Sequence, residues 1–237
     1  MLLAGLGAAL FGGPALLLKA GAPGWDVSLF RILNEVPAAA ASVLTPLSHL
    51  FLPVGIITVV VLTVVYVVAR NRSVLPVATV AAAAGLAWVL AHVAKAVADR
   101  PRPYEVMADA VLRQQPAHGT SFPSSHTAVT LAVAIAIVPF LARLLAAAGI
   151  AYAVLVGWSR VYLGVHYPLD VLAGAGIGMA AGGVILLALG TLLRCPGRAA
   201  NGHDAVTEAR ASRADPRPTA VQNSGRSRAS RGRWRRM

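Results

Sequence analysis

The sequence has one cysteine, Cys195, in 237 residues, so it can form no disulfide within the chain and no metal centre built on cysteine pairs. Charged side chains are also scarce, at 13% of residues against 57% apolar ones, which is far from the composition of soluble globular domains. The sequence consists mainly of long apolar runs, and these favour a protein that crosses a membrane several times.

Six apolar stretches approach the roughly 20 residues that a membrane-spanning helix needs. They predict an all-α, polytopic membrane bundle of about six transmembrane helices, forming one domain over residues 1–194. The first stretch has no basic segment before it and no convincing Ala-x-Ala cleavage site after it, so we interpret it as a span, with a signal peptide as the competing interpretation. The expected spans are 2–18, 52–69, 74–98, 127–145, 146–158 (which could extend through residue 160) and 169–193.

Two features of the apolar part concern how helices are placed. Residues 25–50, between the first two spans, have mixed polarity, which fits either a helix at the membrane interface or a plain connecting loop. In the last span, Gly174, Gly178 and Gly182 recur every four residues, and such a stripe lets a neighbouring helix approach closely.

The formal net charge of +12 lies mostly at the carboxyl end of the sequence. Residues 194–237 hold 11 Arg against 3 acidic residues and lack an apolar pattern, so we expect 195–237 to be a disordered, Arg-rich cytoplasmic tail. Its arginines can contact anionic lipid headgroups or simply act as a solvated topology anchor. Nucleic-acid binding, which charge alone would permit, is not expected.

Arginines in the short loops predict the orientation in the membrane. With six spans, Arg70, Arg72 and Arg143 lie on the same side as the basic tail. By the positive-inside rule that side is cytoplasmic, and both termini lie there. Lys19 and Arg31 fall on the other side, which is a small contradiction of the rule.

Three short polar clusters interrupt the apolar sequence, all on the extracytoplasmic side of the six-span arrangement. Ionisable groups beside hydrocarbon are costly, and they usually have a function. The clusters supply three cations, Lys95, Arg102 and Arg160. Because an arginine can fork onto two phosphate oxygens and a lysine acts as a point charge, this set favours a phosphate site. For Lys95 alone, a side chain reaching to the membrane surface is the simpler interpretation.

The second cluster, Pro123-Ser124-Ser125-His126, precedes an expected helix. Serine is a favoured N-cap, and the free N–H groups of a first helical turn bind phosphate readily. Ser124 and Ser125 could therefore contact phosphate through hydroxyl and amide, or only cap the helix. His126 has no carboxylate near it in the sequence and suits a general acid for a departing oxygen.

In the third cluster, Asp170 follows His166 by four residues, a spacing at which the two side chains can meet. A carboxylate on one imidazole nitrogen fixes the tautomer and leaves the other nitrogen free to attack. The other histidines, His49, His92 and His118, lack such context, and we interpret them as structural or solvated. The sequence has no His-x-x-x-His or cysteine pair, and the cations would repel a metal, so neither a metal nor another cofactor is expected.

Together the three clusters resemble the signature of the type-2 phosphatidic acid phosphatase superfamily, which also includes vanadium-dependent haloperoxidases and bacterial acid phosphatases. The motifs cover residues 95–170, and the pattern of spans extends the resemblance to about 1–193. Ser125 is a departure, since glycine is more usual there. The motifs are Lys95 with Arg102-Pro103, then Pro123-Ser124-Ser125-His126, then Ser159-Arg160 with His166 and Asp170.

The resemblance implies a metal-independent hydrolase of a phosphomonoester or diphosphate, with an active site at the outer face of the membrane. It implies that His166 is the nucleophile that forms a phosphohistidine, that Asp170 orients it and that His126 protonates the leaving group. The residues that it implies for phosphate binding are Lys95, Arg102, Ser124, Ser125 and Arg160.

We therefore expect a multi-pass protein of the cell membrane that acts as a lipid phosphatase. Its substrate would be a lipid phosphate, either a polyprenyl diphosphate such as undecaprenyl diphosphate, or phosphatidic acid or phosphatidylglycerol phosphate. A vanadium haloperoxidase is an alternative, although those relatives are generally soluble. A non-enzymatic lipid transporter or membrane scaffold is another, and the complete motifs argue against it. The sequence leaves the oligomeric state open.

Overall fold

The structure, a computed structural model, describes residues 1–194, and these form helices and connecting loops with no strand among them. The expected all-α class is therefore confirmed for this part of the chain, while the expected disordered tail, 195–237, lies outside the described residues. The helices are α1 (Leu2–Lys19), α2 (Gly24–Asn34), α3 (Ala38–Ser48), α4 (Pro53–Asn71), α5 (Leu75–Ala98), α6 (Pro103–Val106), α7 (Ser125–Ile137), α8 (Arg143–Tyr162) and α9 (Pro168–Arg194), with 3-10 turns η1 (His49–Phe51) and η2 (Val138–Phe140).

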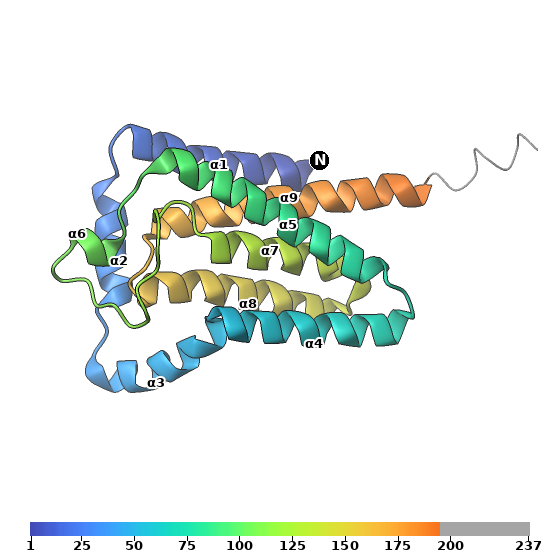
Figure 1. The fold of residues 1–237 in the computed structure, drawn as a ribbon, viewed down its shortest axis with the longest axis horizontal. Coiled ribbons are helices and arrows are strands. Elements are labelled where there is room, and N and C mark those ends of the chain that lie inside the picture. Colours follow the sequence, from blue (N-terminus) through green and yellow to red (C-terminus); the bar gives the residue numbers. More distant parts are fainter. Residues whose placement is uncertain (195–237) are drawn as a thin grey trace, which may run out of the picture. The chain divides into compact units, whose positions relative to one another are not determined.

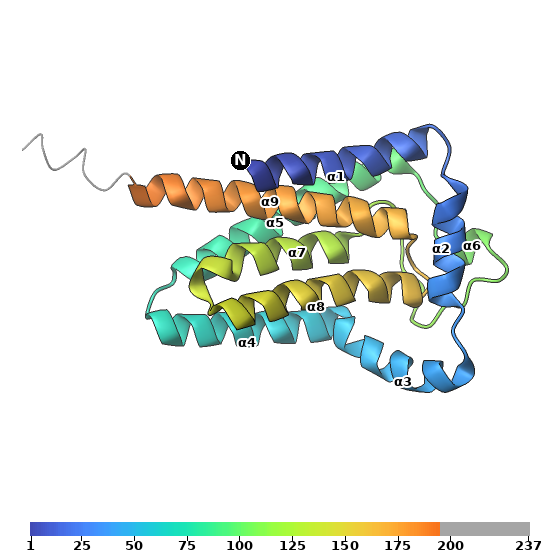
Figure 2. The same ribbon diagram turned by 180° about the vertical axis from the view of Figure 1, so that it is seen from behind.

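The long helices run side by side along one axis, and α2 lies across one end of them (Figure 1, Figure 2). Successive long helices point in opposite directions. This alternation brings the carboxyl ends of α5 and α8 to the same end of the bundle as the amino ends of α7 and α9. The three polar clusters of the sequence are attached to those four helix ends, so they meet there.

Among the described residues, five helices have the length and apolar composition to cross a membrane, or six if the bent pair α2 and α3 counts as one span. The expected total of about six is thus reached only with that pair, which was not among the expected spans. One expected span differs. Residues 127–145 do not form one long helix, because α7 has only 13 residues and passes into the turn η2 at Pro139, whose nitrogen cannot donate to the helical ladder. Helix α8 accordingly starts at Arg143 and is longer than expected.

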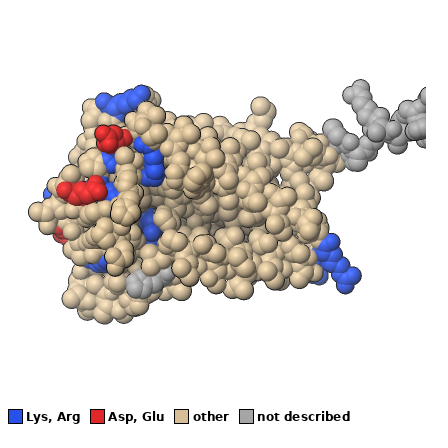
Figure 3. Space-filling model, in the orientation of Figure 1, with Lys and Arg blue, Asp and Glu red and all other residues tan. Residues whose placement is uncertain are grey.

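Charged side chains gather at the two ends of the bundle, with an uncharged band between them on the face seen in Figure 3. One end carries the segments around α2 and α6, and the other carries the turn between α4 and α5 with Arg70 and Arg72. The side chains along the uncharged band of α4 include exposed Val54, Ile57 and Leu62. An apolar band between charged ends is the surface that a bilayer requires.

Small residues let the central helices approach closely. Helix α7 packs against α5 through alanines on both, in a core cluster that also includes Ile177 of α9. The expected role of the glycine stripe of α9 is confirmed, because a Cβ on Gly178 would lie 2.6 Å from the carbonyl oxygen of Ala128, and one on Gly182 would lie 2.9 Å from the side chain of Ile135. This packing fixes the start of α7 against the start of α9.

Residues 25–50, for which an interfacial helix and a plain loop were both open, form α2 and α3, inclined by 95° to each other. One stripe of α2, namely Asp26, Phe30 and Asn34, is buried, whereas Trp25 and Ile32 are exposed. Spacings of four residues put the buried three on a single face. That face is turned toward the end of the bundle where the polar clusters meet.

Candidate active site

The expected nucleophile, His166, lies in the short loop between α8 and α9, and Asp170 lies in the first turn of α9. Both side chains are buried, with exposed fractions of 3% and 0%. Nδ1 of His166 is 3.5 Å from Oδ2 of Asp170, at the outer limit of a hydrogen bond. Because Nδ1 faces the carboxylate, Nε2 is the ring nitrogen left for other contacts.

The loop that carries His166 has a backbone conformation that glycine permits. Gly164 has a φ of +81°, and a Cβ there would lie 2.5 Å from the carbonyl oxygen of Val111. The amides of Val165 and His166 both donate to the carbonyl oxygen of Arg160, at 3.2 and 3.3 Å. The loop is thereby folded back onto the end of α8, which fixes the position of the imidazole.

Asp170 has three hydrogen-bond partners besides the imidazole. Its Oδ1 accepts from Nη1 of Arg100 at 2.6 Å, and its Oδ2 accepts from Oγ of Ser121 at 2.5 Å and from the amide of Tyr167 at 2.9 Å. Sequence reasoning missed Arg100 and Ser121. Both stand two residues before a motif residue, the first in an Arg-Pro-Arg-Pro run, and that proximity was the available signal.

Burial lowers the pKa of His166 from 6.5 to about 4, and the adjacent carboxylate of Asp170 opposes this shift without cancelling it. The main cause is the loss of solvation that a charged imidazolium would suffer in the protein interior. At neutral pH the ring is therefore uncharged, which is the form that can act as a nucleophile.

Arg102 contacts the chain on both sides of the site. Its Nε donates to the carbonyl oxygen of Gly119 at 2.9 Å, and its Nη2 donates to that of His118 at 3.1 Å. Its Nη1 donates to the carbonyl oxygen of Val165 at 3.0 Å, next to the nucleophile. One buried guanidinium thus ties the loop before α7 to the loop before α9.

The other two expected cations have backbone partners as well. Nζ of Lys95 donates to the carbonyl oxygen of Thr120 at 2.6 Å, and Nη2 of Arg160 donates to that of Phe51 at 2.8 Å. Arg160 is almost fully buried at the end of α8. Both cations are therefore held in place by the chain at the edge of the same pocket.

The two serines of the second motif point to different places. Ser125 lines the pocket, and its Oγ is buried with no hydrogen-bond partner among residues 1–194. Ser124 is fully buried, and its Oγ accepts from Oγ1 of Thr127 at 3.0 Å while its amide donates to the carbonyl oxygen of Asp170 at 3.0 Å. Of the two serines, Ser125 is thus the one that lines the pocket with an unpartnered hydroxyl.

One pocket of about 880 Å³ unites the three clusters and holds both imidazoles. His92 and His118, which we had interpreted as structural or solvated, also line it, and neither their spacing nor their neighbours in the sequence indicated this. The side chain of His49 is not among those described. Of the expected site residues, Lys95, Arg102, Ser125, His126, Arg160 and His166 line the pocket.

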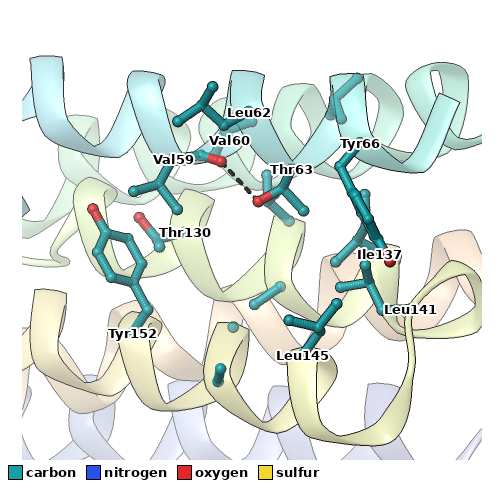
Figure 4. A pocket seen from close by; sticks show the side chains of 15 residues that line it. Val59, Val60, Leu62, Thr63, Tyr66, Thr130, Ile137, Leu141, Leu145 and Tyr152 are labelled. Carbon is teal, nitrogen blue, oxygen red and sulfur yellow. Dashed lines mark hydrogen bonds between the residues drawn. The ribbon is translucent and has the colours of Figure 1, made fainter. Parts of the chain in front are cut away.

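A second, mainly apolar groove of about 530 Å³ lies between α4, α7 and α8. Figure 4 shows Thr130 and Tyr152 at one end of this groove and Tyr66 and Leu141 at the other. Thr130 lines both the groove and the polar pocket, and its buried Oγ1 has no hydrogen-bond partner among the described residues. The groove therefore meets the polar pocket at Thr130 and runs along the bundle toward Tyr66 and Leu141.

Among residues 1–194, no three His, Cys, Asp or Glu side chains come together as a metal site would require. The donor set around the pocket is instead rich in cations, which suits an anionic ligand. Metal independence stays a prediction.

The helix arrangement and the buried His–Asp pair beside three cations define a multi-pass membrane protein with the architecture of a phosphatase. The profile of the PAP2 superfamily matches residues 74–194, a range that contains all three motifs. The chain belongs to the PAP2 superfamily.

Two curated relatives share part of the sequence. An undecaprenyl-diphosphatase of Sulfolobus acidocaldarius is 37% identical over 89 residues, which cover 38% of this chain and 43% of the relative. YbjG of Escherichia coli, provisionally named an undecaprenyl-diphosphatase, is 31% identical over 161 residues, covering 65% of this chain and 77% of the relative. The match to the first relative thus spans less than half of that protein.

Two solved structures have the same fold. The crystal structure of LpxE from Aquifex aeolicus has a TM-score of 0.58 and 29% identity, covering 70% of this chain and 96% of LpxE. The PAP2-type phosphatidylglycerolphosphate phosphatase of Bacillus subtilis has a TM-score of 0.59 and 22% identity, covering 81% of this chain and 98% of that one. The second likeness concerns the fold alone.

Proposed function

We propose that this protein is an integral-membrane lipid phosphatase that removes phosphate from a phosphomonoester or diphosphate headgroup through a phosphohistidine. The observation that carries the proposal is that all three motifs contribute to one pocket, which is lined by both imidazoles and by three cations. Cations around a transferring phosphoryl group stabilise the charge that develops on its oxygens.

In the first step Nε2 of His166 attacks phosphorus, and the bond from phosphorus to the leaving oxygen breaks. His126, at the start of α7 in the same pocket, gives its proton to that oxygen as it departs. Asp170 keeps Nδ1 of His166 protonated, so that the attacking nitrogen carries the lone pair.

In the second step water attacks the phosphohistidine, its proton passes to His126, and inorganic phosphate leaves with His166 restored. Lys95, Arg102 and Arg160 supply positive charge at the pocket wall throughout. The hydroxyl of Ser125 has no hydrogen-bond partner among the described residues, so it is free to donate a hydrogen bond to a phosphate oxygen.

A lipid substrate suits the surroundings of the pocket. The apolar groove that shares Thr130 with the pocket offers space for a hydrocarbon chain. The names of the relatives favour a polyprenyl diphosphate, and that of the Bacillus subtilis structure names phosphatidylglycerolphosphate. We propose undecaprenyl diphosphate or a similar polyprenyl diphosphate first.

The pocket faces the extracytoplasmic side, and both termini are cytoplasmic. Support comes from Arg70 and Arg72 at the end of α4 and from Arg143 at the start of α8, since both of these helix ends point away from the pocket. Basic loops favour the cytoplasmic side.

The proposal is tested by measuring phosphate release from undecaprenyl diphosphate, phosphatidic acid and phosphatidylglycerol phosphate by the protein purified in detergent, with EDTA present. We expect the protein to hydrolyse at least one of these lipids. EDTA should not reduce this turnover, and His166→Ala should abolish it. Absence of turnover on all three by a folded wild-type protein would contradict the proposal.

A further inference from the structure

The buried stripe of α2 contacts the segments that build the active site. Asn34 donates from Nδ2 to the carbonyl oxygens of Val111 and Tyr162, both at 3.0 Å. Phe30 packs its ring against Tyr167, the residue after the nucleophile, with centroids 5.5 Å apart. The third member of the stripe, Asp26, is a fully buried carboxylate, and the mechanism above does not use it.

Asp26 is linked to the orienting carboxylate through one arginine. Nη2 of Arg100 is 2.5 Å from Oδ2 of Asp26, and Nη1 of the same guanidinium is 2.6 Å from Oδ1 of Asp170. Both carboxylates are fully buried, and Arg100 is only 9% exposed. Water therefore screens the charges of these three residues less than it would at the protein surface.

Asp26 and Arg100 each make a further contact near the start of α9. Oδ1 of Asp26 accepts a hydrogen bond from the amide of Leu169, in the first turn of α9, at 2.8 Å. The guanidinium of Arg100 lies over the ring of Tyr167, 3.9 Å from its centroid. The linked side chains of Asp26, Arg100 and Asp170 therefore connect α2 to the first turn of α9.

Charge decides what Asp26 adds. Arg100 and Asp170 alone would form a neutral pair, and a neutral pair stabilises an adjacent cation weakly. With Asp26, the three linked side chains of Asp26, Arg100 and Asp170 carry one net negative charge. The carboxylate of Asp170 is the member of this group that lies beside Nδ1 of His166. The imidazole becomes cationic when Nε2 bonds to phosphorus while Nδ1 keeps its proton, so a net negative neighbour lowers the free energy of that state.

We propose that Asp26 and Arg100 are positioning residues that hold the carboxylate of Asp170 against His166 and keep the net charge beside the imidazole at minus one. The inference rests on the proposed function, because it assigns a task within that reaction. Neither residue lines the substrate pocket, so both act on the reacting group through Asp170.

Other charged groups face the imidazole and must be held constant in any test. Lys95 approaches it from the last turn of α5, Arg102 from the residue before α6, and His126 from α7. None of these contacts Asp26. A substitution at Asp26 or Arg100 therefore changes the charge on one side of the imidazole and leaves the other sides as they are.

The experiment compares kcat, KM and the pH profile of kcat/KM for wild type, Asp26→Asn, Arg100→Gln and the double variant, each checked for folding by gel filtration and thermal unfolding in detergent. We expect each single variant to lose about tenfold to hundredfold in kcat with little change in KM. The acid limb, meaning the fall of kcat/KM at low pH, should move to lower pH in Asp26→Asn, because a negative charge near the imidazole is lost. It should move to higher pH in Arg100→Gln, because a positive charge is lost, and each shift should be on the order of one pH unit. The double variant restores the net charge, so its limb should return toward that of wild type.

Two further variants keep the test decisive. Asp109→Asn removes a carboxylate from an exposed pair with Arg31 at the same end of the molecule and should leave the profile unchanged. If Arg100→Gln does not fold, Arg100→Lys replaces it, and the limb of Arg100→Lys should stay at the wild-type position while that of Asp26→Asn moves down.

The inference would be overturned if the acid limb of kcat/KM lay at the same pH in wild type and in folded Asp26→Asn. It would also be overturned if the acid limbs of the two single variants moved in the same direction. Either result could occur with an active wild type and an inactive His166→Ala, in which case the proposed function stands and only the positioning role fails. An inactive wild type would instead overturn the proposed function.

Discussion

Nη1 of Arg102 donates to the carbonyl oxygen of Val165 at 3.0 Å, so the arginine of the first motif is bonded to the residue directly before the nucleophile. The same guanidinium holds the carbonyl oxygens of Gly119 and His118. Arg102 therefore has two tasks, since it fixes the loops that shape the pocket and also brings positive charge to it. The first task depends on the planar fork of the guanidinium, which a lysine lacks.

Arg102→Lys keeps the charge but cannot hold carbonyl groups on two sides. We expect a fall of about a hundredfold in kcat/KM, of the size seen when a charge-stabilising donor is lost, together with a lower melting temperature. Steady-state kinetics and thermal unfolding in detergent measure the two effects. Arg31→Lys, in an exposed ion pair, is the matched control and should behave like wild type. Unchanged kinetics in Arg102→Lys would contradict the assignment.

The lowered pKa of His166 makes stability depend on pH in a defined direction. Its pKa falls from 6.5 to about 4 on folding, so above pH 6.5 the ring is neutral in both states. As pH drops from 6.5 toward 4 the unfolded chain binds a proton that the folded protein does not, and stability is lost. At pH 5 this loss is about 2 kcal/mol.

Thermal unfolding at pH 7.5 and pH 5, for wild type and His166→Gln, measures that contribution. Wild type should lose more stability on acidification than the variant, which lacks the titrating ring. Equal losses in the two proteins would show that burial does not hold the imidazole neutral.

The sequence predicted the spans and the catalytic motifs better than it predicted the residues that hold the catalytic side chains in position. His166, Asp170 and the three cations were recognisable because ionisable residues in an apolar chain are conspicuous. Asp26 was not, because its partner Arg100 is 74 residues away and only the crossing of α2 over the bundle end brings them together. Likewise α7 was expected to be longer, since hydropathy alone does not show that Pro139 ends it.

The two serines of the second motif should respond differently to alanine. Ser125→Ala removes a hydroxyl with no present partner, so stability should hold while kcat/KM falls about tenfold through a lost hydrogen bond to phosphate. Ser124→Ala breaks a bond from Thr127 in the core and should lower the melting temperature more than it lowers kcat/KM. The reverse pattern would place the phosphate at the other serine.

A large side chain introduced at position 149 should occupy the apolar groove. Gly149 lines the groove, and no heavy atom lies within 4 Å of the position that a Cβ would take there. Gly149→Phe should raise KM for a long-chain lipid phosphate about tenfold, the value of a few buried methylene groups, and leave hydrolysis of a short, water-soluble phosphate unchanged. Gly85→Phe is the control, because Gly85 is equally open but lies outside the groove. Equal effects of both variants would mean that the hydrocarbon chain binds elsewhere.

A covalent phosphate on His166 can be detected by rapidly quenching the protein after mixing it with a lipid that carries radioactive phosphorus at its terminal phosphate. We expect a protein-bound phosphate with the stability of a phosphohistidine, up to one per chain, that forms before free phosphate appears and is absent from His166→Gln. Turnover by His166→Gln at the wild-type rate, or phosphate attached to a residue other than His166, would contradict it.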